Sequence, residues 1–111
     1  MLNISIVDSR TRLRLVLEGT VIAPWVAELR RTWEAIRAEL RGRKLVIEFR
    51  NVTLISQEGE NALLDRMREG ARFSCDGVFT RQVIQQLARR CKLDPRELLY
   101  PTRSHIGKRK E

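Results

Sequence analysis

Apolar and polar residues alternate along the first part of the chain. The apolar positions of this pattern are Leu2, Ile4, Ile6, Leu13, Leu15 and Leu17. Alternation with a period of two is typical of half-buried strands, and the polar residues 8–11 between the two runs are typical of a turn. The pattern therefore predicts a hairpin of two strands, and we expect Gly19 to end the second strand.

The apolar spacing changes to a helical period after Pro24, whose fixed φ suits the first residue of a helix. The apolar stripe of this segment is Val26, Leu29, Trp33, Ile36 and Leu40. It predicts a helix that runs to Leu40, with Gly42 as its stop. We expect Trp33 to lie in the core and Trp25 to be partly exposed at the helix start.

The short apolar run Leu45–Phe49 predicts a central strand that is covered on both faces, or nearly so. Leu54 and Ile55 are expected to return to the core, and Ser56 to open a second helix that ends at Gly70. The buried side of this helix is expected to be Ala62, Leu63 and Met67.

A fourth strand is predicted at Arg72–Cys75, and Thr80 is expected to cap a third helix. The inner face of that helix is Val83, Ile84 and Leu87, with Cys91 at its end. The order β-β-α-β-α-β-α predicts a single α/β domain with a mixed sheet of four or five strands and helices mainly on one face. We expect this domain to span residues 1–100, and residues 101–111 to form a basic flexible C-terminal tail.

The length of 111 residues fits one domain. The longest uncharged stretch, residues 19–27, has nine residues, far fewer than the roughly 20 that a membrane span needs. The N-terminus shows no secretion signal, and the two cysteines are too few for a disulfide framework. These features favour a cytoplasmic protein without a membrane span.

The chain is basic, with 22 Lys plus Arg against 14 Asp plus Glu and a formal charge of +8. Clustered cations on the first helix and near the C-terminus fit nucleic acid or anionic lipid as a partner. However, both tryptophans belong to the first helix pattern, so the aromatic platform of a single-strand binder is not visible. We expect most of this charge on solvated helix surfaces and do not expect nucleic acid as the partner.

The sequence offers few residues that are suited to catalysis. The only histidine, His105, lies in the basic tail, and the sequence contains neither a nucleophile elbow nor a phosphate-binding loop nor a metal-ligand cluster. Cys75 is expected to be a small core residue, and a redox role for Cys91 is less favoured than structural filling. We therefore expect no catalytic residue, no cofactor and no metal.

The ordered set of segments resembles the STAS domain family, which is typified by bacterial anti-sigma-factor antagonists. The stretches that carry the resemblance are Leu15–Gly19, Trp25–Leu40, Leu45–Ile55, Leu63–Val83 and Lys92–Asp94. The resemblance covers about residues 1–100, and its best piece is V-T-L-I-S-x-x-G at residues 52–59. It implies the fold given above and a non-enzymatic role in binding a regulatory protein.

The phosphorylation switch of the family follows this best piece, and the pattern departs from it here. Aligned on Gly59, Ser56 takes the place of the family's Asp, and Glu58 takes the place of the phosphorylatable Ser or Thr. Phosphorylation is therefore not expected at Glu58, and whether Ser56 or Thr53 is phosphorylated stays open. Glu58 is expected to supply a permanent negative charge at the helix N-terminus, although acidic residues are also common there simply because of the helix dipole.

The partner-binding surface implied by the resemblance is the loop and first turn of the second helix. Its members are Thr53, Ser56, Gln57, Glu58, Gly59, Glu60 and Asn61. We expect Ser56 to cap the helix and Gly59 to allow a close backbone approach. The expected partner is an anti-sigma factor or a similar kinase-like regulator, and the expected outcome is control of transcription in bacterial signalling.

Two alternatives stay open at this stage. The chain resembles stand-alone STAS subunits that bind the ATPase of a lipid or ABC transport system, and its charge keeps a basic nucleic-acid-binding module in consideration. Homodimerisation through the exposed sheet or helices also stays open. We expect the identity of the partner to separate these readings.

Overall fold

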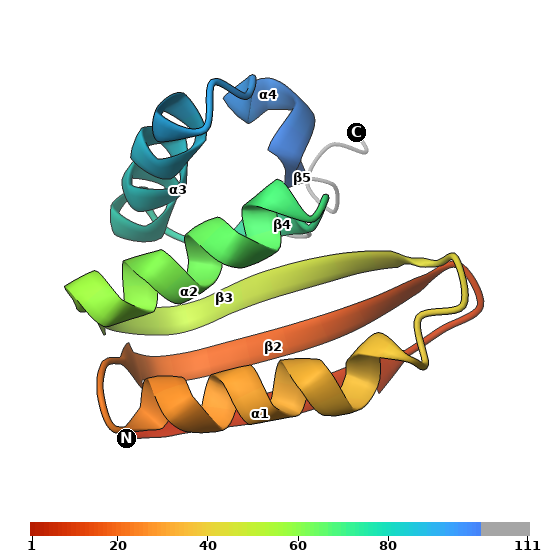
Figure 1. Cartoon of the computed structure of the whole chain (residues 1–111). Helices are drawn as coiled ribbons and strands as arrows, with labels where there is room; N and C mark the ends of the chain where they lie inside the picture. The colour runs from red at the N-terminus through yellow and green to blue at the C-terminus, as the bar shows by residue number, and fades with distance from the viewer. Residues whose placement is uncertain (101–111) are drawn as a thin grey trace, which may run out of the picture.

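Five strands form one mixed sheet in the order β1-β2-β3-β4-β5 in the computed structural model, which describes residues 1–100 (Figure 1). The elements along the chain are β1 Leu2–Asp8, β2 Arg12–Val21, α1 Trp25–Arg37, β3 Lys44–Ile55, α2 Gln57–Arg68, β4 Arg72–Cys75, α3 Val78–Arg90, α4 Pro95–Leu98 and β5 Leu99–Tyr100. β1 pairs antiparallel with β2, and the other pairs are parallel. The predicted α/β class and mixed sheet are confirmed, whereas the predicted tail at 101–111, with His105, lies outside the described residues.

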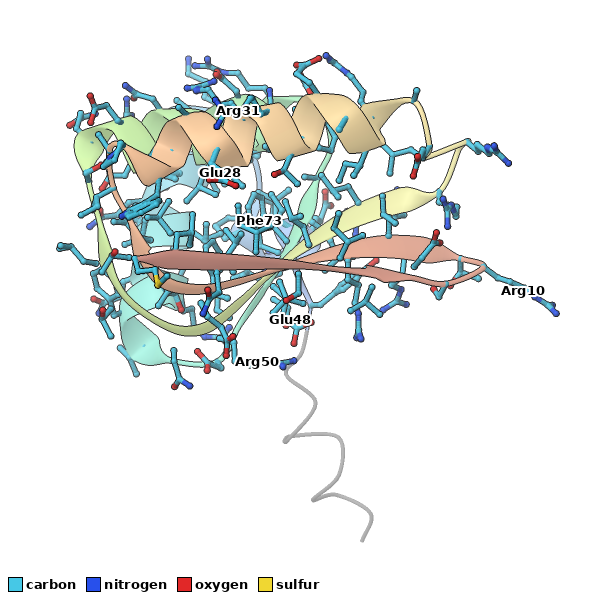
Figure 2. All side chains as sticks on the ribbon, turned by 90° about the horizontal axis from the view of Figure 1, so that it is seen from below. Arg10, Glu28, Arg31, Glu48, Arg50 and Phe73 are labelled. Carbon is cyan, nitrogen blue, oxygen red and sulfur yellow. The ribbon has the colours of Figure 1, made fainter. Side chains whose placement is uncertain are left out.

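The helices cover one face of the sheet. Figure 2 shows α1 on one side and the side chains of Glu48 and Arg50 on the other. The expectation that Leu45–Phe49 is covered on both faces, or nearly so, is nevertheless confirmed, because Val46 on the face without helices is only 1% exposed. Val46 lies between Arg14 and Arg72 in the strand register, and the long aliphatic stems of arginines shield neighbouring apolar residues from water.

The core lies between the sheet and the helices. Phe49 of β3 and Phe73 of β4 stack with their ring centroids 6.2 Å apart. Trp33 of α1 is 4% exposed, which confirms its predicted place in the core. The guanidinium groups of Arg37 and Arg66 lie over its ring, at 5.8 and 4.8 Å from the centroid, so cation–π contacts close this side of the core.

Both long strands run further than their patterns predict. β2 continues through Gly19, which has a φ of +106°, and ends at Val21. Leu17 of β2 pairs with Phe49 of β3, 32 positions later, whereas Val21 pairs with Ile55, 34 positions later. β3 therefore contains two extra residues over this stretch, which form β-bulges. The bulges break the alternation of β3, and Leu54, which was expected in the core, is 50% exposed.

The helix boundaries differ from the expected ones by one to three residues. α1 begins one residue after Pro24, which is its N-cap, and ends at Arg37 instead of Leu40. The Nε of Arg43 donates to the carbonyl oxygen of Leu40 at 2.9 Å, which holds the chain in a turn beyond the helix.

α2 ends just before Gly70, whose φ of +98° fits the predicted stop. The expected cap of α3 is wrong, because Gly77 takes that position and Thr80 lies inside the first turn. The Thr80 hydroxyl donates to the carbonyl oxygen of Gly77 at 3.3 Å and is buried there. The predicted inner face of α3, at Val83, Ile84 and Leu87, is confirmed, and α4 and β5 extend the predicted element order.

Candidate functional site

The carboxyl edge of the parallel strands gathers the starts of three helices. β2, β3 and β4 run in the same direction, and each is followed by a helix that turns back across the sheet. The N-termini of α1, α2 and α3 therefore lie at one end of the molecule, on the left in Figure 1. Helix N-termini carry a partial positive charge and unpaired N–H groups, so this edge favours anionic groups.

Ser56 connects this edge of the sheet to the start of α2. Its Oγ accepts a hydrogen bond from the backbone N–H of Gly59 at 3.2 Å, which confirms the predicted helix cap. Its own backbone N–H donates to the carbonyl oxygen of Val21 at 3.0 Å. The end of β2 and the beginning of α2 are thereby held by the same residue, and the direction in which α2 leaves the sheet is fixed.

Gly59 is buried against the end of β2. A Cβ at this position would lie 2.3 Å from the carbonyl oxygen of Val21 and 3.0 Å from the Val21 Cγ1. Real Cβ atoms do not approach so closely, and therefore only glycine allows the first turn of α2 to lie this near to β2. The close backbone approach expected at Gly59 is made within the chain, to Val21.

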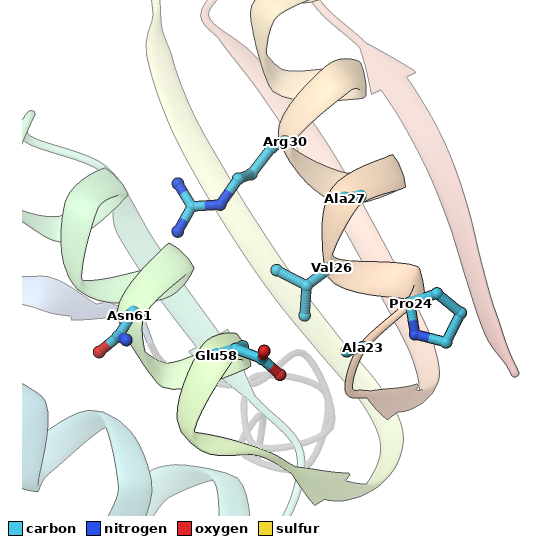
Figure 3. Close-up of a pocket in the computed structure, with 7 residues that line it drawn as sticks. All are labelled: Ala23, Pro24, Val26, Ala27, Arg30, Glu58 and Asn61. Atoms are coloured by element: carbon cyan, nitrogen blue, oxygen red, sulfur yellow. The ribbon is translucent and has the colours of Figure 1, made fainter.

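Glu58 lies in the first turn of α2 and is exposed. It borders a hollow of about 270 Å³ whose other lining residues are Ala23, Pro24, Val26, Ala27, Arg30 and Asn61. Figure 3 shows the Glu58 carboxylate pointing from α2 into the space in front of α1. Arg30 reaches across from α1, but its guanidinium pairs with Asp65 at 3.1 Å. Glu58 forms no ion pair with any described residue, so its carboxylate is available to a partner.

The other predicted site residues share the same surface. Gln57 and Asn61 are exposed, and their side-chain amides lie 3.4 Å apart. Glu60 is half-buried and lies 3.9 Å from the guanidinium of Arg90 on α3. Thr53 is exposed on the bulged end of β3. The structure thus brings the predicted residues together at the carboxyl edge, with Gly59 alone buried beneath the others.

Three exposed apolar residues at this edge were missed by the sequence analysis. Leu54 at the end of β3 is 50% exposed, and Val78 and Phe79 in the first turn of α3 are 71% and 43% exposed. The position of Gly77 before two consecutive apolar residues is a signal that could have located Val78 and Phe79 outside the inner face of α3. Exposed apolar side chains beside a polar helix start are common in protein-binding surfaces.

The cysteines fit structural roles. Cys75 is fully buried on β4, and burial raises the pKa of its thiol to about 11, so the reactive thiolate is disfavoured. Cys91 is half-buried at the end of α3 and packs against the core. Residues 1–100 contain no group of three or more His, Cys, Asp or Glu side chains arranged to hold a metal ion. Among those residues, no helix has the length and apolar character needed to cross a membrane.

Comparisons with known proteins place this arrangement in a class of folds. No protein-family model matches the sequence, and no curated protein matches it. The structure of the anti-sigma factor antagonist SpoIIAA in its unphosphorylated form is similar, with a TM-score of 0.58 and 18% identity, over 77% of this chain and 82% of that one.

A second similar structure is an uncharacterised protein of the DUF3478 family with a SpoIIAA-like fold from Shewanella loihica PV-4. Its TM-score is 0.61 at 11% identity, and the match covers 96% of this chain and 91% of that one. The chain therefore has an α/β fold of the SpoIIAA class, which is a STAS-like domain. At these identities the similarity establishes the fold alone.

Proposed function

We propose that this chain is a non-enzymatic protein-binding domain that acts as an anti-sigma-factor antagonist does, by docking the start of α2 on a regulatory protein. The observation that carries the proposal is the exposed carboxylate of Glu58 in the first turn of α2, which forms no ion pair with residues 1–100. The similar fold of SpoIIAA supports the choice of partner class, which is an anti-sigma factor or another kinase-like regulator. The consequence of binding is control of transcription.

The electrostatics at this position support a fixed state of the binding surface. A phosphate on a serine would carry about −1.5 to −2 charges at neutral pH, whereas Glu58 carries about one charge permanently. The positive end of α2 stabilises either group. A domain with Glu58 at this position is therefore not switched by phosphorylation of that residue.

Two groups of residues contribute to the proposed surface in different ways. The polar group is Thr53, Ser56, Gln57, Glu58, Glu60 and Asn61, and the apolar group is Leu54, Val78 and Phe79. Burial of the apolar group by a partner supplies most of the affinity, because desolvated apolar side chains dominate such interfaces. The charge of Glu58 supplies orientation and specificity, since complementary charges discriminate between partners.

The proposal is tested by capturing the partner from the native cell with the full chain as bait and identifying it by mass spectrometry. A regulatory protein of the anti-sigma or kinase-like class is the expected result. A membrane-associated transport ATPase would replace the transcriptional role with that of a transporter subunit, and recovery of nucleic acid alone would overturn the protein-binding role.

Substitutions at Glu58 then test the surface. Glu58→Gln keeps the shape and removes the charge, and we expect the affinity for the captured partner to fall about tenfold, which corresponds to about 1.4 kcal/mol. Glu58→Ser restores a phosphorylatable residue and is expected to weaken binding similarly until it is phosphorylated. The matched control is Glu97→Gln, which removes an exposed first-turn carboxylate from α4. Unchanged affinity in both Glu58 variants would remove Glu58 from the binding surface.

A further inference from the structure

The two edges of the sheet differ in how they are protected. β5 is an edge strand of two residues, whereas β1, at the other edge, has seven residues and, within residues 1–100, a single neighbour, β2. Natural proteins protect long edge strands with Lys, Pro or bulges. The strand β1 has none of these, because its sequence is L-N-I-S-I-V-D and its pairing with β2 is regular throughout.

The charge of β1 is unusual for this chain. Charged residues make up 32% of the sequence, and the formal net charge is +8, so two copies carry a net repulsion. β1 contains one charged residue, Asp8, which is paired with Arg43. Ile6 and Val7 are exposed by 48% and 38%. Because β1 contains no Lys or Arg, the β1 strands of two copies can meet without repulsion between like charges on those residues.

Two hydrogen bonds show which backbone groups of β1 face outward. The N–H of Thr20 donates to the carbonyl oxygen of Met1 at 2.9 Å, and the N–H of Ser9 donates to the carbonyl oxygen of Arg12 at 3.1 Å. Hydrogen-bonded and non-bonded pairs alternate in an antiparallel ladder. The odd-numbered residues of β1 therefore bond to β2. The residues whose N–H and C=O groups point away from β2 are Leu2, Ile4, Ile6 and Asp8.

We propose that β1 pairs with β1 of a second copy, antiparallel and around a two-fold axis at Ser5, to form a continuous ten-stranded sheet. In this register Ile4 faces Ile6 of the second copy and Leu2 faces its Asp8, so all outward N–H and C=O groups are bonded. Ser5 faces Ser5 of the second copy in a pair that is not hydrogen-bonded. The exposed Ile6 side chains are covered on the helix side of the sheet, and the interface is isologous, as two-fold symmetry requires.

The register is tested by disulfide formation in full-length protein carrying Cys91→Ser, since Cys75 is fully buried. Residues in a non-bonded antiparallel pair have Cα atoms about 4.5 Å apart, which falls within the range of about 4.4–6.8 Å that disulfides span. Ser5→Cys is therefore expected to give a covalent dimer under mild oxidation. Val7→Cys is the matched control on the same strand and face, and it is expected to stay monomeric because Val7 faces Asn3 of the second copy.

Self-association without cysteines is tested by sedimentation equilibrium. The mass of the wild-type protein is expected to rise from 13.0 kDa toward twice that value as the concentration increases. Ile6→Lys introduces a charge at the interface at a position that is already half exposed, and we expect it to raise the dimer dissociation constant by at least about tenfold. The circular dichroism spectrum of this variant is expected to match that of the wild type.

Two results would overturn the inference. The first is a wild-type protein that keeps the monomer mass at every concentration and forms no disulfide through Ser5→Cys. The second is cross-linking of Val7→Cys as readily as Ser5→Cys, because this would mean random collision or another register. Neither result bears on the role proposed for Glu58, since β1 and the start of α2 are separate surfaces.

Discussion

Gly59 and Val21 are in contact at a distance that no other residue type at position 59 would allow. The contact joins the first turn of α2 to the last residue of β2, which are 38 positions apart in the sequence. A Cβ on Gly59 would lie 2.3 Å from the Val21 carbonyl oxygen, and that oxygen also accepts the backbone N–H of Ser56. The geometry of the candidate binding surface therefore depends on this close approach together with the hydrogen bonds of Ser56.

Substitution of Gly59 by alanine is expected to destabilise the protein. The added methyl group meets backbone and the branched side chains of Val21 and Ile55, so α2 has to move away from the sheet. We expect the free energy of unfolding to fall by about 1–3 kcal/mol, as for other overpacked sites, measured by urea denaturation.

The control for this prediction is Gly77→Ser at the N-cap of α3. A Cβ at Gly77 meets nothing within 4 Å, and the φ of −148° is accessible to any residue. Serine is a favoured N-cap, so the stability of this variant should be unchanged or slightly raised. A Gly59→Ala protein as stable as Gly77→Ser would show that the start of α2 moves freely relative to β2.

The sequence predicted the order of the first seven elements because these helices and strands follow a clear period, whereas the short α4 and β5 were not predicted. Trp33 could be assigned to the core from the apolar spacing of its helix, and Cys75 from its residue type on a predicted strand, and the structure confirms both. Ser56 could be recognised as a cap because its hydroxyl precedes a helical run by the right interval, and a cap is a local interaction.

The parts that could not be predicted depend on contacts between distant segments. Leu54 follows an apolar pattern and is nevertheless exposed, since the bulges of β3 become visible only in its register with β2. The backbone N–H of Asn51 in β3 donates to the carboxylate of Asp76, which follows β4, at 3.1 Å, and the two residues are 25 positions apart. No local propensity contains such information, and the exposure of Leu54 was missed for this reason.

The buried thiol of Cys75 is expected to make stability depend on pH in the alkaline range. Burial raises its pKa from 9.0 to about 11 in the folded protein. Between these values the unfolded chain has released the proton and the folded chain still holds it. The free energy of unfolding therefore falls as the pH rises through this window, by about 2 kcal/mol.

Comparison with Cys75→Ala isolates this contribution. The variant loses stability at every pH because a small cavity is created, but the slope due to the thiol should disappear. Urea denaturation of both proteins at several pH values measures the difference, in which contributions common to the two proteins cancel. Parallel curves for the two proteins would mean that Cys75 reaches water in the folded state.

Substitutions of the exposed apolar residues at the carboxyl edge are expected to change the affinity for a partner without changing the free energy of unfolding. Leu54→Ser and Phe79→Ser remove side chains that are 50% and 43% exposed, so the free energy of unfolding should change by no more than about 0.5 kcal/mol. If a partner buries these side chains, its affinity should fall more than about tenfold, since apolar anchors dominate interfaces. Leu93→Ser is the matched control, because Leu93 is 39% exposed beyond the opposite end of α3. Equal affinities of all three variants in calorimetric titrations with the captured partner would place the binding surface elsewhere on the domain.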